Sequence, residues 1–296
     1  MHPDTSTARV IPRKATPPVS VALHPILSGE IRLAVMRPRR PRRGPAKLVR
    51  TLAGGVTRRG RWYPVPAYLV MHPHHGPVMI DTGYAHDVDR DPARTLGTLF
   101  GRVLMRHRLT GPPVTDRLAR LGVGAREVRT VVMTHLHLDH ASGAEEFPDA
   151  TFVVDARERA AATGQRGPGP YACVHLDRIG AWRTLDPDAG TPFDAFSRTH
   201  DLLGDGSIRL VATPGHSPGH LAVLLRLSGR WALLCGDAAM STRELAEPLV
   251  DGLIVDQDRY LAAGDELRAF IARHPDTLAI PSHDADLWRR LPDRAA

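Results

Sequence analysis

The sequence predicts an α/β sandwich, in which helices cover packed β-sheets. Three observations support this prediction. From about residue 21, runs of β-forming residues alternate with stretches of helical apolar spacing. Two pairs of these runs flank short turns, which indicates antiparallel hairpins that a simple strand–helix winding would lack. Hydrophobic residues make up 42% of the 296 residues, which is enough to build a sizeable core.

Each strand is predicted from a run of β-forming residues bounded by turn signals. In order, these runs cover residues 67–71, 78–81, 128–133, 151–154, 208–212, 221–227, 231–235 and 277–280. The segment HPHHGP joins the first two runs as a hairpin, and residues 228–230 join 221–227 to 231–235 as another. Apolar residues at helical spacing predict helices over residues 95–106, 115–121, 156–162 and 261–272.

The chain is expected to be one folded domain over residues 21–296, preceded by a flexible tail over residues 1–20. The tail has no apolar segment of the kind found in secretory signals. Every apolar run is shorter than the roughly 18 residues that a membrane span needs. The two cysteines, Cys173 and Cys235, do not make a disulfide framework. We therefore expect a cytoplasmic protein without a membrane partner.

Positive charge is concentrated in one segment. The formal net charge is +7, but ten basic residues and no acidic ones lie between Arg37 and Arg61. Proline and glycine are frequent there, so we expect an irregular loop. We interpret it as a solvated loop; the alternative is an arm that attracts anions such as nucleic acid.

Side chains of the metal-ligand type follow the predicted strand at 128–133. They are His135, His137, Asp139 and His140. In an extended chain, the side chains at 135, 137 and 139 share one face. His140 breaks this alternation, so we expect the backbone to turn there through the small residues 141–143. Imidazole and carboxylate groups are ligands that Zn²⁺ and similar cations prefer.

Three more ligand-type residues also follow strand-like runs: His216 after 208–212, Asp237 after 231–235, and His283 after 277–280. Strands of one sheet bring their ends together, and functional sites are commonly built from the loops there. Five histidines and two aspartates are enough for a dinuclear centre, with three ligands for each ion and one shared carboxylate. In contrast, we expect the histidines at 72, 74 and 75 to lie in a solvated turn, and Cys235 to be a small buried hydrophobic residue.

The segments THLHLDHASG, AYLVMHPHHGPVMIDTG, TPGHSPGH and GDAA occur in this order. With them, the chain resembles the metallo-β-lactamase superfamily from about residue 29 to residue 288. Within the superfamily, it is most similar to the N-acyl homoserine lactonases. The resemblance implies an αβ/βα sandwich of two packed mixed β-sheets flanked by helices.

The resemblance also implies a role for each ligand-type residue. One divalent ion would be held by His135, His137 and His216, and the other by Asp139, His140 and His283, with Asp237 bridging the two and Asp81 supporting the site. We expect Zn²⁺, although Mn, Fe and Co suit the same donors. Asp139 and Asp237 would also act in catalysis by transferring a proton.

The function that this resemblance implies is hydrolysis of the lactone ring of N-acyl homoserine lactones by a hydroxide shared between the two ions, which would quench quorum signalling. One position departs from the family pattern: Met240 stands where these lactonases have a tyrosine, and Tyr84 is a candidate replacement donor. The expected partner is a small-molecule lactone or ester; we expect no nucleic-acid partner and leave a homodimer open.

Two alternatives use the same residues differently. The metal site could act on a thioester or on a phosphodiester such as RNA. The chain could instead be a non-catalytic module that holds nucleic acid through the basic segment, although a complete ligand set argues against this.

Overall fold

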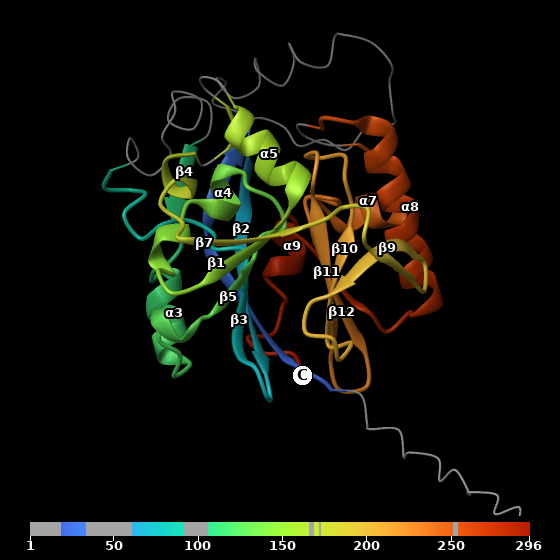
Figure 1. Ribbon diagram of the computed structural model, residues 1–296, viewed down its shortest axis with the longest axis horizontal. Helices are drawn as coiled ribbons and strands as arrows, with labels where there is room; N and C mark the ends of the chain where they lie inside the picture. The colour runs from blue at the N-terminus through green and yellow to red at the C-terminus, as the bar shows by residue number, and fades with distance from the viewer. Residues whose placement is uncertain (1–18, 34–60, 92–105, 166–168, 172, 251–253) are drawn as a thin grey trace, which may run out of the picture.

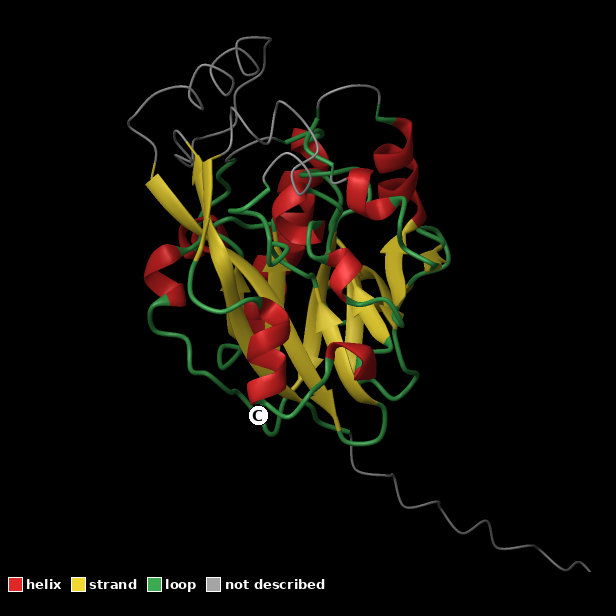
Figure 2. Ribbon diagram, turned by 90° about the vertical axis from the view of Figure 1, so that its left-hand side faces the viewer, coloured by secondary structure: helices red, strands yellow, loops and turns green. Residues whose placement is uncertain are grey.

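The computed structural model describes residues 19–33, 61–91, 106–165, 169–171, 173–250 and 254–296. Within these ranges, the chain forms two β-sheets packed face to face, with helices on the outer faces (Figure 1; Figure 2). The predicted sandwich of two mixed sheets flanked by helices is therefore confirmed.

The strands and helices alternate along the chain. The strands are β1 (Ala22–Leu33), β2 (Arg61–His72), β3 (Gly76–Ile80), β4 (Arg106–Leu109), β5 (Thr130–Val132), β6 (Thr151–Asp155), β7 (Ala181–Leu185), β8 (Thr191–Phe193), β9 (Phe196–Asp201), β10 (Ile208–Ala212), β11 (Leu221–Arg226), β12 (Trp231–Gly236) and β13 (Leu278–Pro281). The α-helices are α3 (Val114–Arg120), α4 (Leu138–Ala141), α5 (Ala156–Gly164), α6 (Cys173–Leu176), α7 (Thr242–Ala246), α8 (Gln257–Arg273) and α9 (Ala285–Trp288). Short 3-10 helices cover Ala125–Glu127 and Ala144–Glu146.

The first sheet has the order β4-β1-β2-β3-β5-β6-β7, and the second has the order β13-β12-β11-β10-β9-β8. In the first sheet, β3, β5, β6 and β7 run parallel to one another, whereas β1 pairs antiparallel with both β2 and β4. In the second sheet, β12 and β13 are parallel and the remaining pairs are antiparallel. Both sheets are therefore mixed.

The core lies in three layers that follow from the alternation of side chains along each strand. Tyr68 and Val70 of β2 face the second sheet, where they pack with Val223 and Leu234. Leu69, between them, points to the outer face with the apolar side chains of α3 and α4. On the outer face of the second sheet, α8 buries its own apolar side chains against β11 and β12.

Most of the expected elements are present. The hairpin of β2 and β3, the hairpin of β11 and β12, and the helices α3, α5 and α8 lie where the sequence places them. Five strands were not assigned from the sequence: β1, β4, β7, β8 and β9. The expected helix over residues 95–106 lies outside the described residues except for its last residue, which begins β4. Residues 1–18 of the tail and most of the basic segment also lie outside them. Among the described residues, no helix combines the length and apolar character needed to cross a bilayer.

Candidate metal centre

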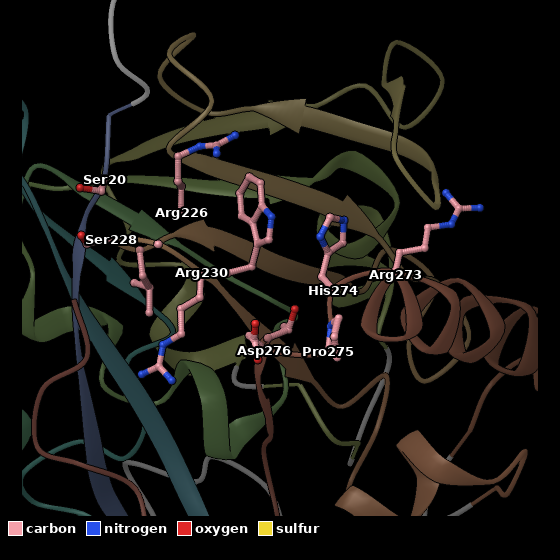
Figure 3. A pocket seen from close by; sticks show the side chains of 12 residues that line it. Ser20, Arg226, Ser228, Arg230, Arg273, His274, Pro275 and Asp276 are labelled. Carbon is pink, nitrogen blue, oxygen red and sulfur yellow. The ribbon is translucent and has the colours of Figure 1, made fainter.

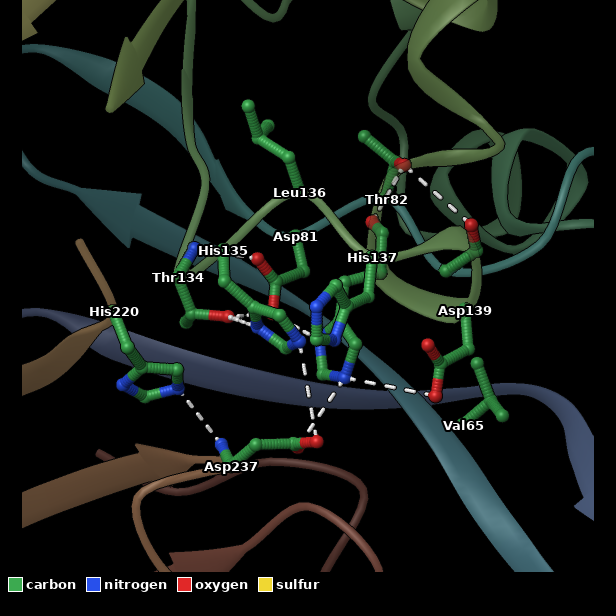
Figure 4. Close-up of polar contacts among 12 residues, drawn as sticks. Val65, Asp81, Thr82, Thr134, His135, Leu136, His137, Asp139, His220 and Asp237 are labelled. Carbon is green, nitrogen blue, oxygen red and sulfur yellow. Dashed lines mark hydrogen bonds and ion pairs between the residues drawn. The ribbon is translucent and has the colours of Figure 1, made fainter. Parts of the chain in front are cut away.

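Five strands finish at the same end of the sandwich. β3 and β5 are parallel neighbours in the first sheet, and β12 and β13 are parallel neighbours in the second. β10 runs in the direction of β12, because both pair antiparallel with β11. All seven predicted ligands follow the carboxyl ends of these strands: His135, His137, Asp139 and His140 after β5, His216 after β10, Asp237 after β12, and His283 after β13. Figure 4 shows His135, His137 and Asp139 on one side of the cluster and Asp237 on the other.

The backbone after β5 turns earlier than the sequence predicts. The helix α4 begins at Leu138 with His137 at its N-cap, so Asp139 is helical and does not share an extended face with His135. The expectation of extended chain through residue 139 was therefore wrong. Close backbone packing explains the small residues that follow: a Cβ atom on Gly143 would lie 3.0 Å from the carbonyl oxygen of Thr82.

One group of buried donors is formed by His135, His137 and His216. The candidate ligand atoms of these three residues lie within 4.8 Å of one another. His216 Nε2 is 3.0 Å from His137 Nδ1 and 3.2 Å from Asp237 Oδ2. His135 Nε2 lies 3.9 Å from the same Asp237 oxygen. These donors surround one point that Asp237 also faces.

The second group is formed by Asp139, His140 and His283. The Nε2 atoms of the two histidines are 3.8 and 3.7 Å from Asp139 Oδ2. Both atoms are also 3.3 Å from Asp237 Oδ1. The two oxygens of Asp237 therefore face different groups of histidines.

Hydrogen bonds behind the cluster fix the orientation of its imidazole rings. His140 Nδ1 donates to Asp81 Oδ2 at 2.7 Å, and His283 Nδ1 donates to the carbonyl oxygen of Pro64 at 2.7 Å. The Thr134 hydroxyl donates to Asp81 and therefore accepts from His135 Nδ1 at 3.1 Å. With Nδ1 carrying the proton, a neutral imidazole presents a lone pair at Nε2. In the neutral form of these rings, three Nε2 lone pairs point into the cluster, and Asp81 lies behind His140.

The donor set fits divalent cations. His135 Nε2, His140 Nε2 and Asp237 Oδ1 are buried and have no hydrogen-bond partner among the described residues. Buried polar atoms are almost always paired, and buried carboxylates need a positive charge close by. A cation among these lone pairs and oxygens would satisfy all three atoms, and histidine nitrogens with carboxylate oxygens are suitable ligands for it.

The pKa values of the cluster indicate the same need for positive charge. Burial and the neighbouring His140 lower the pKa of His135 well below its usual range, which keeps that ring neutral. Burial opposes ionisation of His140 as well, but Asp139 and Asp237 raise its pKa well above the usual value. Burial would raise the pKa of Asp237, yet His283 and the other nearby histidines hold it well below its usual range. Asp237 therefore remains ionised at neutral pH.

A buried glutamate that sequence reasoning missed connects the two histidine loops. Glu158 of α5 accepts hydrogen bonds from the backbone N–H groups of Leu136 at 3.1 Å and Gly219 at 3.0 Å. Leu136 lies between His135 and His137, and Gly219 lies in the loop that carries His216. Burial raises the pKa of Glu158, while these hydrogen bonds oppose the rise. One signal was available: Glu158 shares a helical face with the buried Ala162, four residues later.

Another residue that acts from behind the cluster is His220. Its Nε2 accepts a hydrogen bond from the backbone N–H of Asp237 at 2.9 Å (Figure 4). Its Nδ1 lies 2.8 Å from the Thr213 hydroxyl. Burial lowers the pKa of His220 to about 3, so its ring is neutral. Gly236 makes the approach feasible, because it has φ +53° and a Cβ atom there would lie 2.6 Å from His220 Nε2. His220 therefore supports the backbone of Asp237 directly behind the cluster.

The histidines of the β2–β3 turn behave differently from one another. His74 and His75 are exposed, as expected, but His72 is buried, so the expectation of a solvated turn was wrong for it. His72 Nδ1 accepts hydrogen bonds from the backbone N–H groups of His74 and His75, and its Nε2 lies 2.8 Å from Asp205 Oδ2. Both ring nitrogens are therefore used, which leaves no lone pair for a metal. Although burial opposes it, hydrogen bonds from Ser207 and His72 lower the pKa of Asp205 to about 2.

Three residues discussed in the sequence also have defined positions. Cys235 is fully buried in the apolar layer under α8, as expected, and burial raises its pKa to about 12. Met240 is buried, and its carbonyl oxygen accepts the backbone N–H of His283. Tyr84 is buried beside the ring of His107; its burial, together with the charge of Asp139, raises its pKa well above the usual value. Tyr84 therefore keeps its phenolic proton at neutral pH.

Two packed sheets with histidine and aspartate donors gathered at the strand ends are the arrangement expected of a metal-dependent hydrolase. Comparison with known proteins identifies the family: residues 60–283 match the model of the metallo-beta-lactamase superfamily, and the chain belongs to that superfamily. It is 32% identical over 232 residues to the N-acyl homoserine lactonase AttM of Rhizobium radiobacter, covering 76% of this chain and 83% of the relative. It is 30% identical over 250 residues to the probable metallo-hydrolase Rv2300c of Mycobacterium tuberculosis, covering 77% of each chain.

Solved structures show the same fold. An N-acyl homoserine lactone hydrolase with the product N-hexanoyl-L-homoserine at its catalytic metal centre superposes with a TM-score of 0.70 at 20% identity, over 93% of this chain and 97% of that one. The dizinc quorum-quenching lactonase AidC superposes with a TM-score of 0.59 at 15% identity, over 91% and 90% of the two chains. The chain is thus a hydrolase of this superfamily with a site for divalent metal.

Proposed function

We propose that the protein is a dinuclear metal hydrolase that opens the lactone ring of N-acyl homoserine lactones. The observation that carries the dinuclear assignment is the position of Asp237. Its Oδ1 faces His140 and His283, while its Oδ2 faces His216. One carboxylate placed between two sets of three donors is suited to bridge two cations, which we expect to be Zn²⁺.

In this proposal, His135, His137 and His216 hold one ion, and Asp139, His140 and His283 hold the other. Divalent ions bound there would make a water molecule acidic enough to act as a nucleophile at neutral pH and would polarise the substrate carbonyl.

The carboxylates of the chain have separate tasks in the reaction. Asp237 remains ionised because histidines surround it, so its negative charge serves to hold the two cations in position. The side chain of Asp139 is 9% exposed, compared with 4% for that of Asp237, and we assign Asp139 the transfer of a proton to the leaving alkoxide. Tyr84 retains its proton and is the candidate donor in place of the family tyrosine, because Met240 has no O–H group.

The substrate class rests on the relatives named as N-acyl homoserine lactonases, one of which shares 32% identity over most of this chain. The described residues contain no observation that favours a thioester or a phosphodiester. The basic segment that motivated a nucleic-acid substrate lies outside the described residues, apart from Arg61.

The test is a substrate panel run on the metal-loaded protein with metal analysis of the same sample. We expect ring opening of N-acyl homoserine lactones, without the steep loss of affinity with salt that phosphate-bearing substrates show. In His137→Ala, turnover and bound metal should both fall. His74→Ala, which changes an exposed histidine in the turn at the opposite end of β3 from Asp81, is the matched control. Faster turnover of a thioester or phosphodiester would disprove the substrate, and unchanged turnover in His137→Ala would disprove the metal centre.

A further inference from the structure

A cavity lies at the end of the six-stranded sheet opposite to the candidate metal centre (Figure 3). It has a volume of about 570 Å³ and is lined by the turn between β11 and β12 and by the segment that follows α8. Trp231 begins β12, whereas Asp237 follows its end, so about 20 Å of strand separates the cavity from the candidate metal centre. Its size falls in the range of small-molecule sites.

The lining is rich in positive charge. Arg226, Arg230 and Arg273 line the cavity, together with a single carboxylate, Asp276 (Figure 3). Arg273 is paired with Asp194 at 3.0 Å. Among the described residues, neither Arg226 nor Arg230 has a carboxylate within ion-pair distance. Guanidinium groups without a counter-ion beside a cavity attract carboxylate or phosphate groups.

One wall of the cavity offers an aromatic surface. Trp231 lines it and is held edge-on by Phe193 and Phe270, with ring centroids 5.9 and 6.1 Å away. The guanidinium carbon of Arg226 lies 4.1 Å from the Trp231 ring centroid. A tryptophan held in this way provides a rigid flat surface on which a planar ring can stack.

We propose that this cavity binds a small organic anion that carries a planar ring, with a nucleoside monophosphate as the representative ligand. The acidic group would contact Arg226, and the ring would stack against Trp231, with Arg230 adding positive charge on another side of the cavity (Figure 3). The site is separate from the metal centre, so the proposal does not depend on which ester the enzyme hydrolyses.

The test measures binding of AMP, adenosine and inorganic phosphate to the metal-loaded protein by calorimetry. We expect AMP to bind at least about tenfold more tightly than either fragment, because only AMP engages both the charge and the ring. Arg226→Ala and Trp231→Ala should each weaken AMP binding by about tenfold or more. Arg230→Ala, on an exposed turn, should weaken it in the same direction without affecting the fold.

Arg243→Ala is the matched control, because Arg243 is an exposed arginine on α7 that pairs with Glu247. It should leave AMP binding unchanged, and lactone turnover should be equal in the control and in Arg230→Ala. Adenosine binding as tightly as AMP would overturn the anion site, and phosphate binding as tightly would overturn the stacking surface. No binding of AMP, or binding that is unchanged in Arg226→Ala, Arg230→Ala and Trp231→Ala, would overturn the proposal as a whole.

Discussion

Replacing Glu158 by glutamine tests whether one buried carboxylate holds both histidine loops in position. Glu158 is fully buried and accepts one backbone N–H from each loop, at 3.1 and 3.0 Å. A glutamine side chain keeps one acceptor oxygen but presents an NH₂ group to the other N–H, so one of these donors loses its acceptor. An unsatisfied buried donor costs about 1–3 kcal/mol, and we expect the free energy of unfolding to fall by that amount.

The loss should also be visible in metal binding. Residues that orient metal ligands from behind typically change metal affinity by about 10- to 100-fold when mutated. Chelator competition on Glu158→Gln should therefore show weaker binding by at least the lower figure, and urea unfolding should show the stability loss. Glu127→Gln is the matched control, because Glu127 accepts a backbone N–H from Gly124 at the exposed surface. Wild-type stability and metal affinity in Glu158→Gln would refute the bridging role.

Three further changes probe other parts of the structure. Gly236→Ala should lower the melting temperature and the metal content, because φ is +53° there and the new Cβ atom would meet the ring of His220; a wild-type melting temperature would argue against this. Asp81→Asn should weaken metal binding by about 10- to 100-fold in chelator competition, because it removes the carboxylate that orients His140; unchanged affinity would exclude that role. The pKa of Asp205 is lowered on folding to about 2, so its stabilisation is complete above its unfolded pKa of about 3.9 and is lost as pH falls through about 2. Urea unfolding of Asp205→Asn should show a deficit of about 2 kcal/mol at neutral pH that disappears in acid, and a deficit independent of pH would contradict the linkage.

The sequence was sufficient to predict that the seven candidate residues lie together, because they follow strand-like runs and strand ends converge in a packed sheet. His216, Asp237 and His283 are far apart in the chain, yet they lie next to the histidines that follow β5. The error at Asp139 was local: the pattern of alternate residues is compatible with extended chain, whereas in the structure a helix begins at Leu138.

The parts that the sequence could not predict depend on contacts between distant segments. β1 contains a proline, a glycine and several polar residues, and it is a strand because β2 and β4 pair with it on either side. His72 belongs to a turn composed of polar residues, so its burial depends on Asp205, which is remote in sequence. The roles of Glu158 and His220 likewise consist of hydrogen bonds to backbone groups of other loops, which no local pattern encodes.

The division of the donors between the two sheets affects the order of events during synthesis of the chain. Each set of three donors takes two residues from the loop after β5 and a third from the second sheet, so neither half of the chain can complete a coordination sphere alone. The ribosome produces residue 135 long before residue 283. In the proposed metal centre, the early histidines would therefore lack a full set of partners until the second sheet is made, and metal capture would be a late step that links the two sheets.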